Sequence, residues 1–429
     1  MKSMHRGIST MRNFAVCVFT VILWLGCAVA KADTVLDWNE IAVNTAIANG
    51  QSPFAQARFA AIAQLAVFEA VNSITGDYQP YLGTIQAPRG ASVDAAAIQA
   101  AYRVLSTYFP KSVTTLDTQR ANSLAAIADG QAKQDGIKTG DDAGKAMIKL
   151  RTDDGSSPAQ FKTPGAPLAG EWEATPSCPT VGGVQVGAFF HWQHVMPFGI
   201  ASAEAFLLDP PPALKSSEYA KAYNEVKTVG SHNSTERSQD RSNVATFYAA
   251  SSPTQVFNQA ARQIAQAQGR SISENARALA LINMAMNDSL VASFLNKYHY
   301  NFWRPETAIA AGGIDGNRKT DPDTTYSPFI VTPCFPSHPS NHGSGSGGGA
   351  EVLRRLYGEG GHSITISNAA VPNITFQYTT FKQILDDISD ARVFGGIHFR
   401  FDQVAGASLG RAVGTAVYKN NLRPVHDED

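Results

Sequence analysis

The stretch that decides the fold lies at residues 333–357, PCFPSHPSNHGSGSGGGAEVLRRLY. Its three prolines within seven residues fix an extended approach, and the Gly/Ser-rich run leads into a helical pattern at 350–357. Ser340 and Asn341 therefore fall near a helix N-terminus, where free backbone N–H groups and the helix dipole favour an anion. Ser340 can also serve as the N-cap, and the two roles are compatible. The glycines between 343 and 349 let another backbone or an oxyanion come close, so we expect a tightly packed helix there and not a linker.

A zinc site is the alternative for this stretch. His338 and His342 are four residues apart and could share a helical face. Pro339 argues against placing His338 inside a helix, and no Glu stands beside His338 to act as a base. The anion interpretation is therefore favoured over zinc.

Two basic residues precede the stretch. Lys297 and Arg304 are seven residues apart, so on a helix they would lie on one face, roughly 10 Å apart along the axis. Pro305 would end or bend that helix. Aromatic residues surround the pair, and cations in an apolar setting hold an anion strongly. The alternative is a pair of basic side chains whose stems cover an aromatic surface.

A third cluster follows, with Arg392, His398 and Asp402. Arg392 and His398 would lie about 240° apart on an unbroken helix, so they act together only if the chain turns at Gly395 and Gly396. His398 and Asp402 are four residues apart and can share a face. Asp402 can then bond one ring nitrogen of His398 and present the other, which is how a histidine is oriented as a ligand or nucleophile.

Helical periodicity predicts an all-α protein, a large helical bundle with long loops and at most a minor β-hairpin at 364–381. Residues 152–212 are rich in Gly, Pro, Ser and aromatic residues, and we expect a loop that wraps the fold or rims a pocket. The expected helices span residues 35–48, 54–72, 92–108, 115–132, 135–151, 217–229, 238–248, 254–268 and 273–296.

The first 32 residues have the pattern of a secretory signal peptide, because basic residues precede a short apolar run and small residues offer A-x-A cleavage patterns. Cleavage after Ala32 removes four basic residues and no acidic ones, so the formal charge changes from −1 to −5. We therefore expect a secreted or periplasmic protein that does not bind nucleic acid. Residues 33–429 are expected to form one domain, with an N-terminal helical half (33–230) and a half that carries the anion site (231–429).

No further apolar run was judged long and clean enough to span a bilayer, because the best of them, 276–290, contains charged and amide residues. The sequence therefore predicts no integral membrane association, and it leaves a homo-oligomer open. Cys178 and Cys334 are the two cysteines outside the leader. In an oxidising compartment we expect them to form a disulfide, although two unpaired buried thiols are the alternative.

The three clusters together resemble a known signature: Lys, six residues, Arg-Pro; then Pro-Ser-Gly-His; then Ser-Arg, five residues, His, three residues, Asp. It is shared by the vanadium-dependent haloperoxidases and the type 2 phosphatidic acid phosphatase superfamily. The stretches FPSHPSNH (335–342) and RVFGGIHFRFD (392–402) look especially like the haloperoxidase branch. In two places the chain departs from the signature, with Asn341 in place of Gly and Ala391 in place of Ser.

The resemblance implies a vanadate cofactor and a reaction in which hydrogen peroxide oxidises halide to a hypohalous species that halogenates a small organic acceptor. It implies that His398 is the single protein ligand of the metal, with His342 as acid-base residue and Asp402 orienting His398. In an acid phosphatase, the alternative function, the same layout uses no metal and makes His398 the nucleophile. A protein that only binds an oxyanion is the third hypothesis. The residues implied to bind vanadate oxygens are Lys297, Arg304, Ser340, the backbone amide of Asn341, and Arg392.

The resemblance leaves the halide open. Phe335 stands at a position where chloride-oxidising members of the family carry a similar residue. One residue does not set the oxidising power, however, and His338 could tune the pocket instead. Asn341 keeps the backbone N–H of the signature while adding a side chain. We therefore expect Asn341 to narrow the pocket and to alter access of peroxide or halide.

Overall fold

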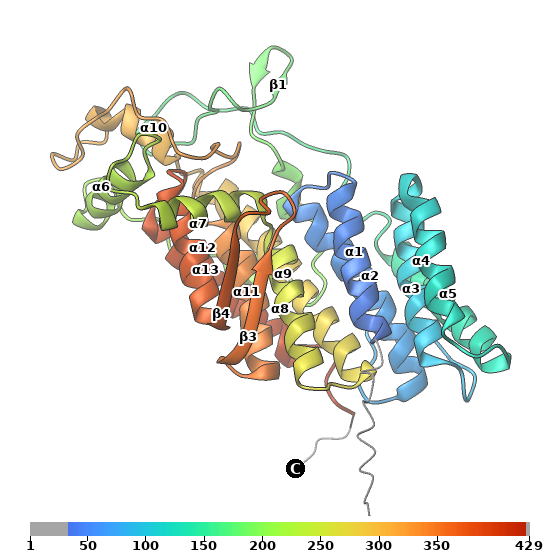
Figure 1. The fold of residues 1–429 in the computed structure, drawn as a ribbon. Coiled ribbons are helices and arrows are strands. Elements are labelled where there is room, and N and C mark those ends of the chain that lie inside the picture. Colours follow the sequence, from blue (N-terminus) through green and yellow to red (C-terminus); the bar gives the residue numbers. More distant parts are fainter. Residues whose placement is uncertain (1–32, 426–429) are drawn as a thin grey trace, which may run out of the picture. The chain divides into compact units, whose positions relative to one another are not determined.

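Helix α9 (Ile272–Tyr300) runs through the centre of the fold and is buried on almost every side (Figure 1). The computed structural model describes residues 33–425. A helix that is apolar all round belongs in a protein core. It begins at Ser271, which forms a capping box with Glu274, and it ends at Asn301 in the left-handed conformation. These caps explain why the helix extends beyond the predicted 273–296.

The N-terminal helices lie together on one side of α9, in blue to cyan in Figure 1. Helix α2 packs against α9 and α3, and α3 packs against α5. The helix predicted at 115–132 is shorter than expected, because the chain breaks before Gly130, whose φ is +148°. The five helices are α1 (Thr34–Ala48), α2 (Pro53–Thr75), α3 (Val93–Tyr108), α4 (Val113–Ala125) and α5 (Gln131–Leu150).

The C-terminal half adds seven further helices, of which α11 and α13 pack against α9 and against each other. The periodicity did not predict α12 or α13, and α10 is a short helix after Arg304. The seven are α6 (Ser217–Gly230), α7 (Gln239–Ala250), α8 (Pro253–Ala267), α10 (Pro305–Ala310), α11 (Asn341–Tyr357), α12 (Phe381–Phe394) and α13 (Arg400–Asn420).

The Gly/Ser run is the packing face of α11, as the sequence predicted. A Cβ added at Gly348 would lie 2.4 Å from Ser289 Oγ on α9, and one added at Gly410 would lie 2.1 Å from the Ser344 carbonyl oxygen. Only glycine allows helices to approach this closely. The helix already begins at Asn341, nine residues before the apolar pattern at 350, because Ser340 caps it.

The strands are few, so the prediction of an all-α protein is confirmed for the described residues. The predicted hairpin is present as β3 (Gly360–Ser367) and β4 (Thr375–Thr380), antiparallel, with Ile364 opposite Tyr378. A second small hairpin, β1 (Thr180–Val181) with β2 (Val184–Gln185), was not predicted. Short 3-10 turns complete the structure at Pro110–Ser112, Phe190–His194, Glu204–Phe206 and Gly312–Ile314.

The long segment between α5 and α6 contains no α-helix. Cys178 in this segment forms the expected disulfide with Cys334, with the two Cα atoms 5.2 Å apart. The Ala188 N–H donates to the Cys334 carbonyl oxygen at 2.7 Å. These contacts join the loop to the chain just before Phe335, which is where the anion cradle begins.

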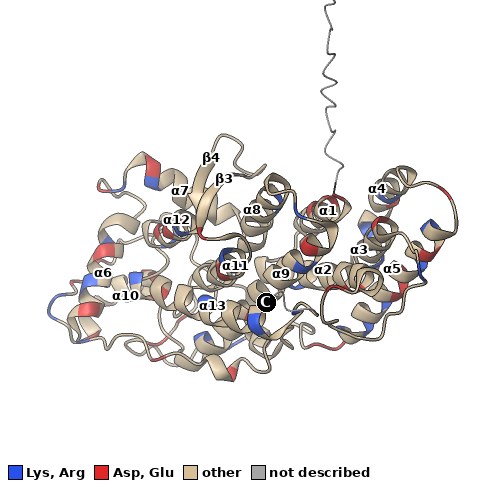
Figure 2. Cartoon of the chain, turned by 90° about the horizontal axis from the view of Figure 1, so that it is seen from below, with Lys and Arg blue, Asp and Glu red and all other residues tan. Residues whose placement is uncertain are grey.

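Two helices, α2 and α9, are long and apolar enough to cross a membrane, so the expectation that no such run exists was wrong on length and composition. Their apolar windows are 89% and 94% buried inside the protein, as in core helices. Lys and Arg are interspersed with Asp and Glu along the ribbon in Figure 2. The signal-peptide prediction at 1–32 lies outside the described residues.

Candidate active site

Lys297 and Arg304 come together from two different helices. Lys297 lies in the last turn of α9, whereas Arg304 caps the start of α10, with Pro305 as its first residue. The prediction of one continuous helical face was therefore wrong, because α9 ends at Tyr300 and the chain turns at Asn301. Both side chains are nevertheless fully buried, and each cation lies over the ring of Phe335, at 5.2 and 5.1 Å.

Lys297 holds the loop that leads into α11. Its ammonium group donates to the carbonyl oxygens of Pro336, Ser337 and Pro339 at 2.7, 2.8 and 2.5 Å. Burial, reinforced by the charge of Arg304, lowers the pKa of Lys297 well below its ordinary value. Lys297 thus fixes the backbone of the cradle and places a cationic group beneath it.

Arg304 connects this loop with His398. Its Nε donates to the Phe335 carbonyl oxygen at 2.9 Å and its Nη1 to the Ile397 carbonyl oxygen at 2.9 Å. The same Nη1 lies 3.0 Å from Nε2 of His398. Nη2 of Arg304 is buried and has no partner among the described residues. The guanidinium therefore retains one free donor beside the histidine.

His398 lies between α12 and α13, after the turn that the sequence predicted. Helix α12 ends at Phe394, and Gly396 adopts φ +82°. A Cβ at Gly396 would meet the Gly230 carbonyl oxygen at 2.3 Å, so both its backbone angle and its space require glycine. The turn brings His398 and Arg392, six residues apart, to the wall of one cavity.

Asp402 fixes the tautomer of His398. His398 Nδ1 lies 3.0 Å from Oδ2 of Asp402, which also accepts hydrogen bonds from the Ser337 hydroxyl at 2.6 Å and from the Phe399 N–H at 3.1 Å. Burial alone would raise the pKa of Asp402, but hydrogen bonds from His338 and His398 outweigh it and hold the pKa well below its ordinary value. Because Asp402 is ionised, Nδ1 of His398 carries the proton and Nε2 keeps its lone pair.

A second histidine shares Asp402. His338 Nδ1 lies 3.1 Å from Oδ1 of Asp402, and its ring is 3% exposed. The sequence indicated His338 only as a zinc ligand or as a residue that tunes the pocket, and it did not indicate a role for Ser337. The chain before α11 is extended and directs this loop toward the first turn of α13. The Ser337 and His338 side chains therefore reach Asp402.

The first turn of α11 forms the cradle that the sequence predicted. Ser340 Oγ accepts a hydrogen bond from the Gly343 N–H at 3.2 Å, and the Ser340 N–H donates to the Asp402 carbonyl oxygen at 2.9 Å. The Asn341 carboxamide is oriented by Ser293 of α9, whose hydroxyl donates to Asn341 Oδ1 at 2.6 Å. Asn341 Nδ2 is then a buried donor without a partner in the described structure.

A cavity of about 580 Å³, here called the site cavity, opens onto these groups. Asn341, His342, Arg392 and His398 contribute its polar wall. Arg392 Nη1 donates to the Tyr248 carbonyl oxygen at 3.3 Å, and its Nε is buried without a described partner. The apolar wall comes from both halves of the chain: Pro53, Phe54, Phe189, Ala249, Pro253, Leu290, Phe329, Ile330, Val331, Pro333 and Phe335.

The N-terminal contribution to this wall was not predicted. Phe54 of α2 and Phe189 of the long loop pack edge-to-face at 4.9 Å between ring centroids, and both line the site cavity. Phe189 confirms that the long loop rims a pocket. Nothing in the local pattern around Phe54 distinguishes it from an ordinary core residue, because its role depends on a contact across the sequence.

Both imidazoles of the site cavity are held neutral. Burial lowers the pKa of His398 well below its ordinary value, and the charge of Arg304 lowers it further. Burial and the charge of Arg392 act in the same way on His342. A neutral His398 can offer Nε2 as a ligand or nucleophile, and a neutral His342 can accept a proton.

The residues fit an oxyanion bound at His398. Three buried donors near the site lack partners among the described residues, namely Arg304 Nη2, Arg392 Nε and Asn341 Nδ2. A tetrahedral or trigonal anion such as vanadate or phosphate would satisfy them together. The described residues contain no group of three or more His, Cys, Asp or Glu side chains of the kind that holds a metal cation. The unpartnered donors therefore suit a tetrahedral or trigonal oxyanion.

Comparison with known proteins also points to proteins that use vanadium. Residues 277–427 match the family model of the second helical-bundle domain of VCPO. A segment of 183 residues is 25% identical to the vanadium chloroperoxidase of Curvularia inaequalis, and it covers 36% of this chain but only 30% of that protein's length.

Two solved structures share the fold over most of the chain. The structure of a bacterial vanadium-dependent iodoperoxidase has a TM-score of 0.76 at 23% identity, with 92% of this chain and 98% of that chain covered. The apo form of a bacterial vanadium-dependent chloroperoxidase has a TM-score of 0.67 at 15% identity, with 84% and 92% covered. At these identities the structural likeness shows the fold.

Proposed function

We propose that this chain is a relative of the vanadium-dependent haloperoxidases and a vanadate-dependent enzyme that oxidises halide with hydrogen peroxide. One observation carries the proposal. His398 lines the site cavity with an unprotonated Nε2, which Asp402 fixes and Arg304 Nη1 contacts at 3.0 Å, while buried donors of Arg304 and Arg392 have no described partner. Ser340 and Asn341 lie at the start of α11, where the helix dipole supports binding of an anion.

We assign the residues as follows. His398 Nε2 is the single protein ligand of the metal, and Asp402 keeps it in the required tautomer. Arg304 and Arg392 would donate to oxygens of the bound anion, together with the Ser340 hydroxyl and the backbone N–H of Asn341. Lys297 lies beneath the same loop and contributes its charge, while its hydrogen bonds hold the loop in place.

Bound vanadate would supply the oxidising chemistry by activating hydrogen peroxide toward halide. The chain's own part is to move protons and to exclude water. His342 lines the site cavity and is held neutral, so one of its ring nitrogens can accept a proton from incoming peroxide. The phenylalanine-rich wall excludes water from the reacting groups and leaves room for a halide and a small organic acceptor.

We also propose export from the cytoplasm. The Cys178–Cys334 disulfide supports an oxidising compartment, as the pattern of residues 1–32 does. Mass spectrometry of the mature protein tests this: a chain that begins after Ala32 is expected, and a reduced, uncleaved chain in the cytoplasm would contradict it.

A paired assay tests the proposed reaction. The purified protein is measured with and without orthovanadate, for peroxide-dependent oxidation of iodide and bromide and for hydrolysis of a chromogenic phosphate ester. Vanadate-dependent halide oxidation is expected. Its absence after vanadate loading, together with ester hydrolysis that vanadate inhibits, would identify the alternative, an acid phosphatase that uses His398 as nucleophile.

A further inference from the structure

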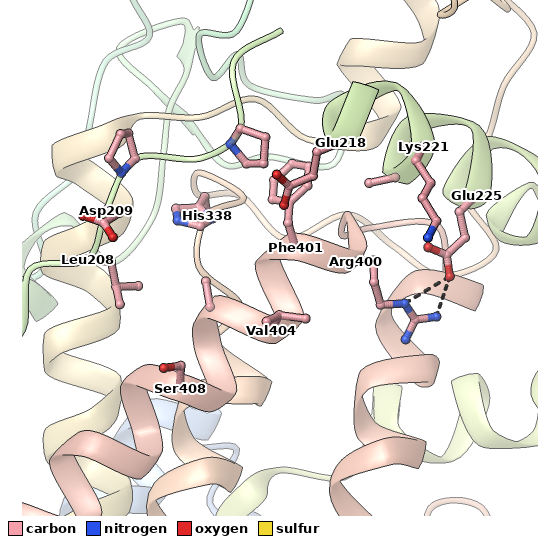
Figure 3. Close-up of a pocket in the computed structure, with 14 residues that line it drawn as sticks. Leu208, Asp209, Glu218, Lys221, Glu225, His338, Arg400, Phe401, Val404 and Ser408 are labelled. Carbon is pink, nitrogen blue, oxygen red and sulfur yellow. Dashed lines mark hydrogen bonds and ion pairs between the residues drawn. The ribbon is translucent and has the colours of Figure 1, made fainter. Parts of the chain in front are cut away.

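A second pocket is linked to Asp402 through His338. Its volume is about 600 Å³, and its lining comes from the end of the long loop, from α6 and from the first turns of α13 (Figure 3). His338 is one of the lining residues, and His338 is bonded to the same carboxylate that orients His398. We call this space the acidic pocket, after Asp209 and Glu218, which line it.

The charges of the acidic pocket are unevenly arranged. At one end, Arg400 is neutralised by Glu225 at 2.7 Å and by Asp390 at 2.8 Å, and Lys221 lies beside Glu225 (Figure 3). At the other end, Asp209 and Glu218 flank His338, and neither carboxylate forms a hydrogen bond or ion pair with another described residue. The second end therefore carries uncompensated negative charge.

His338 contributes an unpartnered acceptor at this end. Its Nδ1 donates to ionised Asp402, so in the neutral imidazole the lone pair is on Nε2. Nε2 lies at the opposite edge of the ring from this hydrogen bond and has no partner among the described residues, although the side chain is 97% buried. A buried ring nitrogen without a partner calls for an explanation, and a ligand that donates a hydrogen bond supplies one.

An aromatic surface lies next to these acceptors. The Phe401 ring centroid is 6.1 Å from that of His338, and both residues line the acidic pocket. Phe401 is anchored from behind by stacking on Phe399, at 5.0 Å and an interplanar angle of 11°. Such a fixed ring face attracts a cation and also packs against an apolar group.

We propose that the acidic pocket binds a small organic ammonium ion with an apolar body. The ammonium group donates to Nε2 of His338, Asp209 and Glu218 balance its charge, and the apolar body lies against Phe401. Asp209 and Glu218 are exposed, so Nε2 of His338 is the buried group at this end that lacks a partner; a donor ligand satisfies it, and two carboxylates disfavour an anion. A divalent metal is a poorer candidate because the described residues contain no cluster of three ligating side chains.

The test measures binding of benzylammonium by titration calorimetry near neutral pH, to purified protein without vanadate in saturating inorganic phosphate, which keeps benzoate out of the site cavity. Benzyl alcohol and benzoate have similar shape but are neutral and anionic. We expect saturable binding of one benzylammonium per chain, weaker binding of benzyl alcohol and none of benzoate. Since no vanadate is present, this result is independent of the proposed oxidation of halide.

Two substitutions probe the charges. Asp209→Asn and Glu218→Gln should each weaken benzylammonium binding about two- to fivefold, because each removes one partly exposed charge interaction. The double variant should weaken it by about the product of the two effects. Glu236→Gln, which removes an exposed carboxylate that does not line the pocket, is the matched control and should bind as the parent protein does.

A spectroscopic measurement probes His338 directly. In 15N-labelled protein, the Nε2 resonance of His338, assigned by its disappearance in His338→Phe, should shift on titration with benzylammonium and not with benzoate. If His338→Phe does not fold, assignment through the carbon-bound ring protons replaces it. Equal affinity for benzoate, absence of saturable binding, or unchanged affinity in the Asp209→Asn/Glu218→Gln double variant would each overturn the proposal.

Discussion

The two cavities that meet at Asp402 are alike in size and opposite in chemistry. The site cavity measures about 580 Å³ and the acidic pocket about 600 Å³. Near the first, the unpartnered buried groups are donors of Arg304, Arg392 and Asn341; in the second, the unpartnered buried group is Nε2 of His338, beside the exposed carboxylates of Asp209 and Glu218. Volume therefore says little about the ligand, whereas the kind of unsatisfied group says whether an anion or a cation fits.

The two histidines that share Asp402 make the same point at closer range. Both donate from Nδ1 to this carboxylate, so both present Nε2 as an acceptor. His398 Nε2 meets the guanidinium of Arg304 at 3.0 Å, whereas His338 Nε2 meets no described group. The charge near Nε2, and not the imidazole itself, decides whether the histidine serves an oxyanion site or accepts a hydrogen bond from a cation.

The largest effect is expected from His398→Ala. Removal of Nε2 takes away the only proposed bond between protein and metal, so vanadate binding and halide oxidation should fall by at least about 100-fold, more than the loss of an outer hydrogen-bond partner causes. Vanadium content after gel filtration and steady-state rates measure this. Benzylammonium binding to the acidic pocket should persist. Full vanadium stoichiometry in this variant would show that the ligand assignment is wrong.

Asp402→Asn is the substitution that should alter both cavities. A carboxamide can no longer accept hydrogen bonds at both of its atoms, so the tautomer of one histidine is lost. We expect vanadate affinity to fall about 10- to 100-fold, and the His338 resonance to change even without ligand.

Asp402 is fully buried, so this variant must first be shown to fold, by circular dichroism and thermal unfolding. Glu225→Gln, which removes a partner of Arg400 in the lining of the acidic pocket, is the control. Equal loss of vanadate affinity in both variants would contradict a specific role of Asp402.

The sequence predicted the site cavity better than the acidic pocket, for physical reasons. Residues 392–402 contain a Gly-Gly turn and a His-Asp spacing whose geometry follows from local backbone rules, and the turn and the hydrogen bond are both present. The prediction that Lys297 and Arg304 share a helical face was wrong, because Asn301 adopts the left-handed conformation and ends α9. The sequence indicates such a helix end only weakly when the residue is not glycine.

The acidic pocket was not predicted at all. Asp209, Glu218 and Phe401 are far apart in sequence, and none of them belongs to a local pattern. The same holds for Phe54 in the wall of the site cavity. Contacts between distant segments depend on how helices pack, and helical periodicity gives only the face that each helix buries.

The stability of the vanadate-free protein should depend on pH through the site cavity. The pKa values of His398 and His342 are lowered on folding, so below about pH 6.5 the unfolded chain takes up protons that the folded chain does not. Stability should therefore fall as the pH is lowered from 7.5 to 5, by up to about 1.4 kcal/mol per pH unit for a fully buried histidine.

Thermal unfolding of the parent protein and of His398→Gln at several pH values measures this effect. The variant should show a shallower decline, whereas the exposed His299→Gln should follow the parent protein. Parallel curves for all three proteins would contradict a neutral, buried His398.

The smallest effect is expected from Asn341→Gly, which makes the chain match the Pro-Ser-Gly-His signature. The substitution removes the Nδ2 donor but keeps the backbone N–H, so vanadate and phosphate should bind about three- to tenfold more weakly, the contribution of one hydrogen bond to an anion. Competition of phosphate with vanadate, followed by equilibrium dialysis, measures both affinities.

Ser293→Ala should have part of the same effect, because Ser293 orients the carboxamide. Ser346→Gly, in the same helix but outside the cavity lining, controls for the loss of helix stability that glycine brings. If Asn341→Gly binds both anions at least as tightly as the parent protein, the carboxamide acts by narrowing the cavity and not as a donor, and the donors near the site reduce to the two arginines and the helix start.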